Sequence, residues 1–103
     1  MANLYNTFET NTDKTKSQNT KKVDILFGLE AGKYIILDTE FDKNIVCVCG
    51  SCDLLLENNN QKETVTLNNY NVTIHLSKDV KTELKNYTKE TKIVVEYLGE
   101  NNG

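Results

Sequence analysis

Alternation of apolar and polar residues dominates the chain and predicts a fold built mainly of β-strands. Val23, Ile25 and Phe27 are separated by single residues, which is the period of a strand because successive side chains point to opposite faces. Ordered structure is expected to begin near residue 22. Further apolar or alternating runs predict strands over 33–39, 44–49, 52–57, 62–67, 72–76 and 92–98.

A tight turn is expected between the two most apolar runs. Gly50-Ser51 separates them, and glycine in the first position of a two-residue loop is typical of a type II′ hairpin turn. Such a hairpin would place Cys49 opposite Cys52. The face expected to be buried then carries only apolar side chains, namely Ile45, Cys47, Cys49, Cys52, Leu54 and Leu56.

A second hairpin is expected over residues 62–76. A loop at 68–71 would pair the strand 62–67 with the strand 72–76 and bring their apolar residues together. The opposite face would be polar, and we consider two interpretations of it: a flat recognition surface, or the solvent side of a half-buried sheet. This face would carry Thr64, Thr66, Thr73 and His75.

One segment predicts a helix, at about residues 78–88. Ser77 is a suitable N-cap, and Val80, Leu84 and Tyr87 follow at the i, i+4 and i+7 spacing of a helix face. Together these elements predict an α+β, β-rich fold, with one helix and an antiparallel sheet or small open barrel of about six to seven strands.

The chain is expected to hold a single globular domain over residues 22–99, with a polar tail at 100–103. Residues 1–21 are mostly polar and cannot bury enough surface to offset the entropy of ordering, which predicts a disordered N-terminal arm. Three apolar residues near its start could dock on a partner or on the domain itself: Leu4, Tyr5 and Phe8.

Charge restricts the class of partner. The chain has 12 lysines, no arginine and 15 acidic residues, for a net charge of −3. Arginine is the usual side chain for bidentate phosphate contacts, so the composition argues against nucleic acid as a partner, although the lysines of the arm and helix leave it as a third alternative. The expected partner is another protein, with a basic one suited to the negative charge, or a second copy bound through a sheet edge.

No apolar run is long enough to cross a bilayer and the first residues do not resemble a signal peptide, so we expect no membrane association and a cytoplasmic location. Three cysteines fit a reducing compartment. They also suggest a zinc or redox-sensitive module as an alternative, with ligands Cys47, Cys49, Cys52 and His75. Only Cys49 and Cys52 have a common zinc-ligand spacing, which favours simple burial instead.

No catalytic constellation or cofactor motif is recognised, so we expect neither catalytic residues nor a cofactor. The abundance of Asn and Lys and the absence of Pro and Arg indicate an AT-rich genome, such as that of a low-GC bacterium or its phages. The sequence therefore predicts a small, non-enzymatic, protein-binding accessory protein of a phage or mobile element, either an inhibitor of a host system or a virion component.

Overall fold

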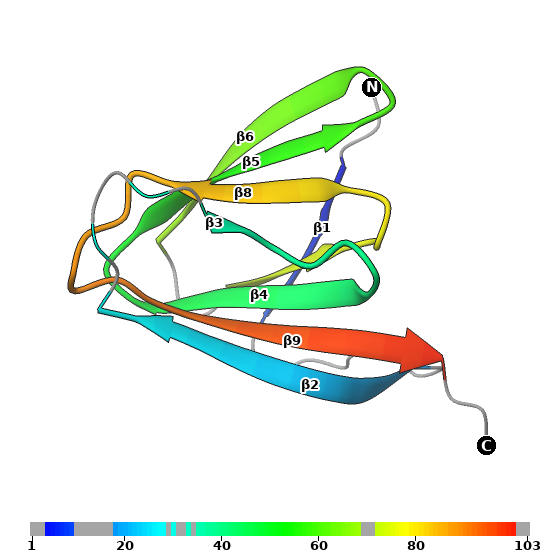
Figure 1. Ribbon diagram of the computed structural model, residues 1–103, viewed down its shortest axis with the longest axis horizontal. Coiled ribbons are helices and arrows are strands. Elements are labelled where there is room, and N and C mark those ends of the chain that lie inside the picture. The colour runs from blue at the N-terminus through cyan, green and yellow to red at the C-terminus, as the bar shows by residue number, and fades with distance from the viewer. Residues whose placement is uncertain are drawn as a thin grey trace.

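Two antiparallel sheets form the molecule (Figure 1). The computed structural model describes residues 4–9, 18–28, 30, 33, 35–68 and 72–100. Within these residues the order along the five-stranded sheet is β1-β7-β4-β9-β2, and along the four-stranded sheet it is β3-β8-β5-β6. The strands are β1 (Asn6–Glu9), β2 (Gln18–Phe27), β3 (Ile35–Ile36), β4 (Asp42–Cys49), β5 (Cys52–Asn58), β6 (Gln61–Leu67), β7 (Val72–Leu76), β8 (Lys81–Lys85) and β9 (Lys92–Glu100).

The core lies between the sheets, where alternate residues of both meet. From the five-stranded sheet, Ile45, Ile93 and Val95 are fully buried, and Leu54 and Leu56 face them from the four-stranded sheet. Each large apolar side chain buried in this way stabilises the fold by about 1.5–3 kcal/mol. The two sheets therefore form a sandwich, with a single apolar layer between them.

The expected hairpin at Gly50-Ser51 is wrong, because β4 and β5 belong to different sheets. β4 pairs with β7 and β9, whereas β5 pairs with β6 and β8. Gly50 (φ +73°) carries the chain from one sheet to the other, and a Cβ there would lie 2.9 Å from the Cα of Thr91. The Thr91 hydroxyl donates a hydrogen bond of 2.9 Å to the carbonyl of Ser51, which fixes the crossing.

Cys49 does not lie on the core face, contrary to expectation. Strict alternation from Cys47 would bury it, but the register with β9 shifts between Cys47 and Cys49. The irregularity leaves Cys49 exposed while Cys47 and Cys52 remain buried. Alternation in the sequence does not reveal such a shift, because its effect depends on the partner strand.

The second expected hairpin, over residues 62–76, is also wrong, since β6 and β7 lie in different sheets. The hairpin of this region is formed instead by β5 and β6. Asn59 and Asn60 connect them and both have positive φ angles, of 49° and 70°, as a type I′ turn requires. Asparagine tolerates this conformation better than most residues, so the run of asparagines was the turn signal.

The expected helix at 78–88 is a strand, β8. Val80, Leu84 and Tyr87 are buried as the helical spacing predicted. However, Thr82 is also fully buried, and its hydroxyl donates to the carbonyl of Val80 at 3.2 Å. Burial at 80, 82 and 84 has the period of a strand. A buried threonine in place of an aliphatic residue concealed that period, and Asn86 (φ 58°) ends the strand.

The residues expected to form the arm contribute to the five-stranded sheet. β1 pairs with β7, and β2 begins at Gln18; residues 1–3 and 10–17 of the expected arm, and residues 101–103 of the tail, lie outside the described residues. The fold is all-β, so the expected α+β class is wrong. The part of the chain that the structure describes contains no helix that could span a membrane.

The sheet crossing predicts that Gly50→Ala is more destabilising than Gly28→Ala. Both glycines have left-handed φ angles, near +70°, but a Cβ at Gly28 meets nothing within 4 Å. Gly28→Ala should lower the free energy of unfolding by the backbone strain alone, about 1–2 kcal/mol. Gly50→Ala adds the collision with Thr91 and should lower the free energy of unfolding further. Chemical denaturation measures both losses. Equal losses in the two variants would contradict a close approach at Gly50.

Candidate functional site

The inner side of strand β2 carries two charged residues, Lys22 and Asp24, beside Leu26, which packs against the core. Lys22 is in register with Tyr97, and Asp24 with Val95. Residues in register share a face of the sheet, and both β9 residues are buried in the core. Lys22 and Asp24 therefore lie on the inner side of β2, at the edge where the five-stranded sheet ends. This arrangement places charge at one open side of an otherwise apolar interior.

Tyr97 lies beside these charges with its ring buried. Its hydroxyl donates a hydrogen bond to the carboxylate of Asp24 and accepts one from the backbone N–H of Asp38, and burial, the largest cause, raises the pKa of Tyr97 to about 12. The ring of Phe41 meets it edge-on, with 6.0 Å between centroids. Tyr97 is therefore protonated at neutral pH and can serve as a hydrogen-bond donor.

An ion pair lies over these two rings. Lys22 Nζ is 3.1 Å from Asp38 Oδ2, 4.7 Å from the centroid of the Tyr97 ring and 5.5 Å from that of Phe41. The backbone N–H of Glu40 donates to Asp38 Oδ1 at 2.8 Å. This hydrogen bond, and then Lys22, lower the pKa of Asp38. The side chain of Lys22 is nevertheless nearly half exposed, so the pair is accessible from solvent.

Lys43 is the most unusual residue of the interior. Its side chain is 0% exposed, and its register partners Tyr97 and Leu76 are core residues. Nζ has no hydrogen-bond partner among the residues that the structure describes. Burial lowers the pKa of Lys43, against the opposing effect of the Asp38 and Asp42 carboxylates. A lysine amine in such surroundings becomes available as a base.

We refer to these residues together as the inner polar cluster. It combines a buried amine, a protonated phenol and an accessible ammonium, which are groups that can accept a proton, donate a hydrogen bond and bind an anion. Within the described ranges no group of three or more His, Cys, Asp or Glu residues could hold a metal ion. The cluster consists of Lys22, Asp24, Asp38, Lys43 and Tyr97.

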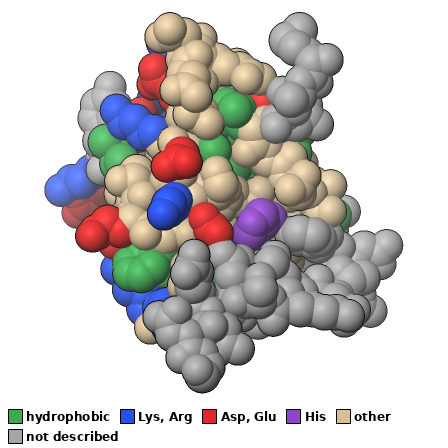
Figure 2. Space-filling view, turned by 90° about the vertical axis from the view of Figure 1, so that its right-hand side faces the viewer, with side chains coloured by type: hydrophobic (Ala, Val, Ile, Leu, Met, Phe, Trp, Pro, Cys, Tyr) green, Lys and Arg blue, Asp and Glu red, His purple; other side chains and the backbone are tan. Residues whose placement is uncertain are grey.

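His75 lies on the opposite, outer side of the five-stranded sheet. Its Nδ1 donates to Asn44 Oδ1 at 2.8 Å, and Asn44 Nδ2 donates to Glu96 Oε1 at 3.2 Å; Thr20 donates to the same carboxylate. Burial, the largest cause, lowers the pKa of His75. The ring of this single histidine is visible at the surface, coloured purple in Figure 2. His75 is therefore separated by the sheet from the inner polar cluster.

The expected threonine face is divided between the two outer surfaces of the sandwich. Thr64 and Thr66 lie on β6 of the four-stranded sheet, whereas Thr73 and His75 lie on β7 of the five-stranded sheet. The apolar residues before β1 belong to the domain itself, since Leu4 and Tyr5 contact the core. Phe8 is in register with Thr73, and its side chain lies outside the described residues.

The cysteines do not assemble a metal site. Cys47 and Cys52 are buried in the core, and the Cys47 thiol donates to the carbonyls of Cys49 and Gly50, both at 3.3 Å. Burial raises the pKa of the Cys47 thiol, and it raises that of Cys52 to about 12. His75 is on the far side of the sheet. The zinc ligand set considered from the sequence is therefore not brought together.

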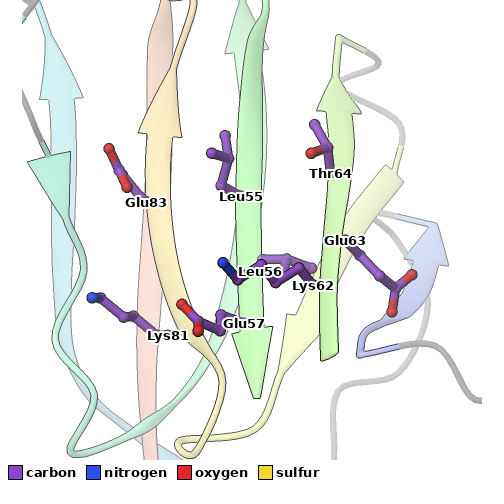
Figure 3. A pocket seen from close by; sticks show the side chains of 8 residues that line it. All are labelled: Leu55, Leu56, Glu57, Lys62, Glu63, Thr64, Lys81 and Glu83. Carbon is purple, nitrogen blue, oxygen red and sulfur yellow. The ribbon is translucent and has the colours of Figure 1, made fainter. Parts of the chain in front are cut away.

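A shallow groove of about 260 Å³ crosses the four-stranded sheet (Figure 3). In register across it lie Lys62 on β6, Glu57 on β5 and Lys81 on β8. Charges that alternate in sign across neighbouring strands are common on solvated sheets. The groove also contains Glu83, whose Oε2 is buried and has no hydrogen-bond partner among the described residues.

Comparison with solved structures shows which known fold the chain shares. WlaRA, a TDP-fucose-3,4-ketoisomerase from Campylobacter jejuni, has a TM-score of 0.77 and 14% identity, covering 96% of this chain and 84% of that one. WlaRB, a TDP-quinovose 3,4-ketoisomerase from the same organism, has a TM-score of 0.69 and 20% identity, covering 82% and 65%. A point mutant of QdtA, a 3,4-ketoisomerase from Thermoanaerobacterium thermosaccharolyticum, solved with TDP-4-keto-6-deoxyglucose, has a TM-score of 0.78 and 14% identity, covering 100% and 85%. The fold is thus the cupin-like sandwich of the sugar ketoisomerases.

Sequence comparison identifies the family. Residues 8–98 match the family described as FdtA: WxcM-like, C-terminal, and the chain belongs to this family. No curated protein sequence matches it significantly. The expectation of a non-enzymatic, protein-binding accessory protein of a phage or mobile element is therefore wrong, because the family and the fold are those of sugar-modifying enzymes.

The inner polar cluster was missed because its members are far apart in the sequence and because Lys43 lies just before the strand predicted over 44–49. One signal was present. Lys43 precedes Ile45 and Cys47 at the spacing of a single strand face, so extending the predicted strand by two residues would have placed a lysine on the core face. A lysine in that position is rarely buried without a function.

The positions of the thiols predict that one cysteine per chain reacts with a thiol reagent in the native state. Cys49 is exposed, whereas Cys47 and Cys52 are buried with raised thiol pKa values, and only the thiolate is nucleophilic. Titration at pH 8 should count one fast thiol in the native protein and three after denaturation. Cys49→Ser should abolish the fast phase; a fast phase of two or three thiols would contradict the buried positions.

Lys43→Met is expected to stabilise the protein at neutral pH. An unpartnered buried amine costs about 1–3 kcal/mol, and methionine fills a similar volume without it. The pKa of Lys43 is lower in the folded state than its ordinary 10.5. Between the folded-state pKa and 10.5 the unfolded chain therefore binds more protons than the folded chain. As the pH rises through this range, the free energy of unfolding of the wild type should increase relative to that of the variant.

Chemical denaturation of both proteins from pH 6 to 10 measures this effect. The difference between them isolates Lys43, because Tyr97 and the buried thiols are common to both. A variant that is less stable than wild type at pH 7, or a difference that does not change with pH, would contradict a buried neutral amine.

Proposed function

We propose that this protein catalyses a proton-transfer isomerisation of a keto sugar carried on a nucleoside diphosphate. The observation that carries the proposal is Lys43, a buried amine without a hydrogen-bond partner in the part of the chain that the structure describes; residues 8–98 of this chain match the family. Moving a carbonyl to the neighbouring carbon of a sugar requires a base that removes a proton from carbon and returns it to the next carbon, and it needs neither oxidant nor reductant.

The inner polar cluster supplies groups for each part of this reaction. The neutral amine of Lys43 removes the proton from the hydroxyl-bearing carbon beside the carbonyl, which gives an enediolate. The hydroxyl of Tyr97 turns from the Asp24 carboxylate and donates its hydrogen bond to the enediolate oxygen. The hydroxyl proton moves to that oxygen, the ammonium of Lys43 returns its proton to the former carbonyl carbon, and the neighbouring carbon becomes the ketone.

Lys22 is the group best suited to the diphosphate. The chain contains no arginine, and Lys22 is the cation of the cluster that solvent reaches. Its ion pair with Asp38 covers the rings of Tyr97 and Phe41. A diphosphate competes with Asp38 for Lys22. Nucleotide binding is therefore expected to move Lys22 away from Asp38 and to expose the rings of Tyr97 and Phe41. Free thiols at all three cysteines fit a cytoplasmic location.

The experiment is incubation with TDP-4-keto-6-deoxyglucose in D₂O, followed by NMR of the sugar. Wild-type protein should form the 3-keto isomer. It should also introduce deuterium at two carbons, the one next to the carbonyl and the former carbonyl carbon. Lys43→Met should lower the rate by about 10²–10⁴-fold, the usual contribution of a general base. Lys22→Met should mainly raise KM, because it removes a phosphate contact.

His75→Gln is the matched control, since its amide can still donate to Asn44 and the residue lies outside the cluster. It should retain the wild-type rate. Wild-type protein that exchanges no deuterium with this nucleotide sugar would refute the proposed function. A Lys43→Met variant with the wild-type rate would refute the role of Lys43.

A further inference from the structure

Moving a carbonyl along a sugar requires two proton transfers, and Lys43 accounts for only one of them. Lys43 would carry the proton between the two carbons. The other proton must leave the hydroxyl oxygen and reach the former carbonyl oxygen. These oxygens are on neighbouring carbons, so a proton held between them would close a five-membered ring, far from the nearly linear arrangement that a hydrogen bond prefers. A second acid–base group is therefore needed to carry it.

The carboxylate of Asp24 lies beside the phenol that would bind the enediolate. Asp24 is on the inner side of β2, in register with Val95, and is half-buried. The hydroxyl of Tyr97 donates its hydrogen bond to this carboxylate while it accepts one from the backbone N–H of Asp38. When the Tyr97 hydroxyl turns to the enediolate oxygen, the Asp24 carboxylate loses that donor. The sugar hydroxyl next to the same oxygen can then take the donor's place.

The carboxylate of Asp38, the other acidic residue of the cluster, is less suited to accept a proton. Its Oδ1 accepts a hydrogen bond of 2.8 Å from the backbone N–H of Glu40, and its Oδ2 lies 3.1 Å from Lys22 Nζ. The hydrogen bond from Glu40 is the largest cause of the lowered pKa of Asp38, and it remains when a diphosphate draws Lys22 away. Asp38 therefore stays ionised, which leaves Asp24 as the carboxylate of the cluster that can gain and release a proton.

We propose that Asp24 is the second acid–base residue of the isomerisation and carries a proton between the two sugar oxygens. The assignment rests on the proposed isomerase function. As the ammonium of Lys43 protonates the former carbonyl carbon, the Asp24 carboxylate takes the proton of the neighbouring hydroxyl, whose oxygen becomes the new ketone. Protonated Asp24 then gives this proton to the former carbonyl oxygen, which becomes the new hydroxyl. Both residues return to their starting states, and no oxidant, reductant or other co-reactant is consumed.

Comparing deuterium exchange with isomerisation tests this role. In D₂O, removal and return of the carbon proton by Lys43 puts deuterium into TDP-4-keto-6-deoxyglucose even when the carbonyl does not move. The 3-keto isomer forms only when the oxygen proton is carried as well. Asp24→Asn keeps the size of the side chain and an oxygen that can accept from Tyr97, but it cannot take up a proton. It should lower isomer formation by about 10²-fold or more and exchange by less than about tenfold, so the ratio of isomer to exchanged substrate should fall.

Asp38→Asn is the matched control, because it makes the same substitution at the other carboxylate of the cluster. It should change isomer formation and exchange by the same factor and leave their ratio at the wild-type value. This ratio does not depend on the fraction of protein that is folded. An Asp24→Asn variant that loses both reactions together, or an equal fall of the ratio in Asp38→Asn, would overturn the role of Asp24 while the isomerase function stands. Wild-type protein that exchanges no deuterium would refute both.

Discussion

The burial of the Lys43 amine between two apolar sheets is the constraint on which the rest of this account depends. An ammonium there has no hydrogen-bond partner among the described residues and is shielded from solvent, so burial lowers the pKa of Lys43. The enclosure that causes this effect is made by the fold itself. Crossings such as that at Gly50 send successive strands to opposite sheets and close them over one interior.

Strand β2 connects this interior to the surface. Lys22 and Asp24 lie on its inner side at the open side of the sandwich, and Leu26 on the same side packs against the core. Its outer residues Val23, Ile25 and Phe27 are exposed. The same strand therefore contributes to the core at one end and brings charge to the edge of the interior at the other.

The sequence predicted the existence of strands well and their pairing poorly. The strand over 92–98 has its expected bounds almost unchanged in β9, since alternation is a local signal. Pairing depends on where each turn leads, and Gly50 connects two sheets rather than two neighbouring strands. Thr82 concealed a strand because a buried threonine counts as polar in the pattern. The candidate site could not be predicted either, because its residues come together only when β2 and β4 pair with β9.

Site-resolved NMR of the lysine side chains tests the central claim most directly. In protein labelled with ¹³C at lysine Cε, the resonance of Lys43, assigned by its loss in Lys43→Met, should titrate below the ordinary lysine pKa of 10.5, because burial of its amine lowers the pKa. A Lys43 resonance that titrates at 10.5 or above would show that the amine is solvated and would contradict the account.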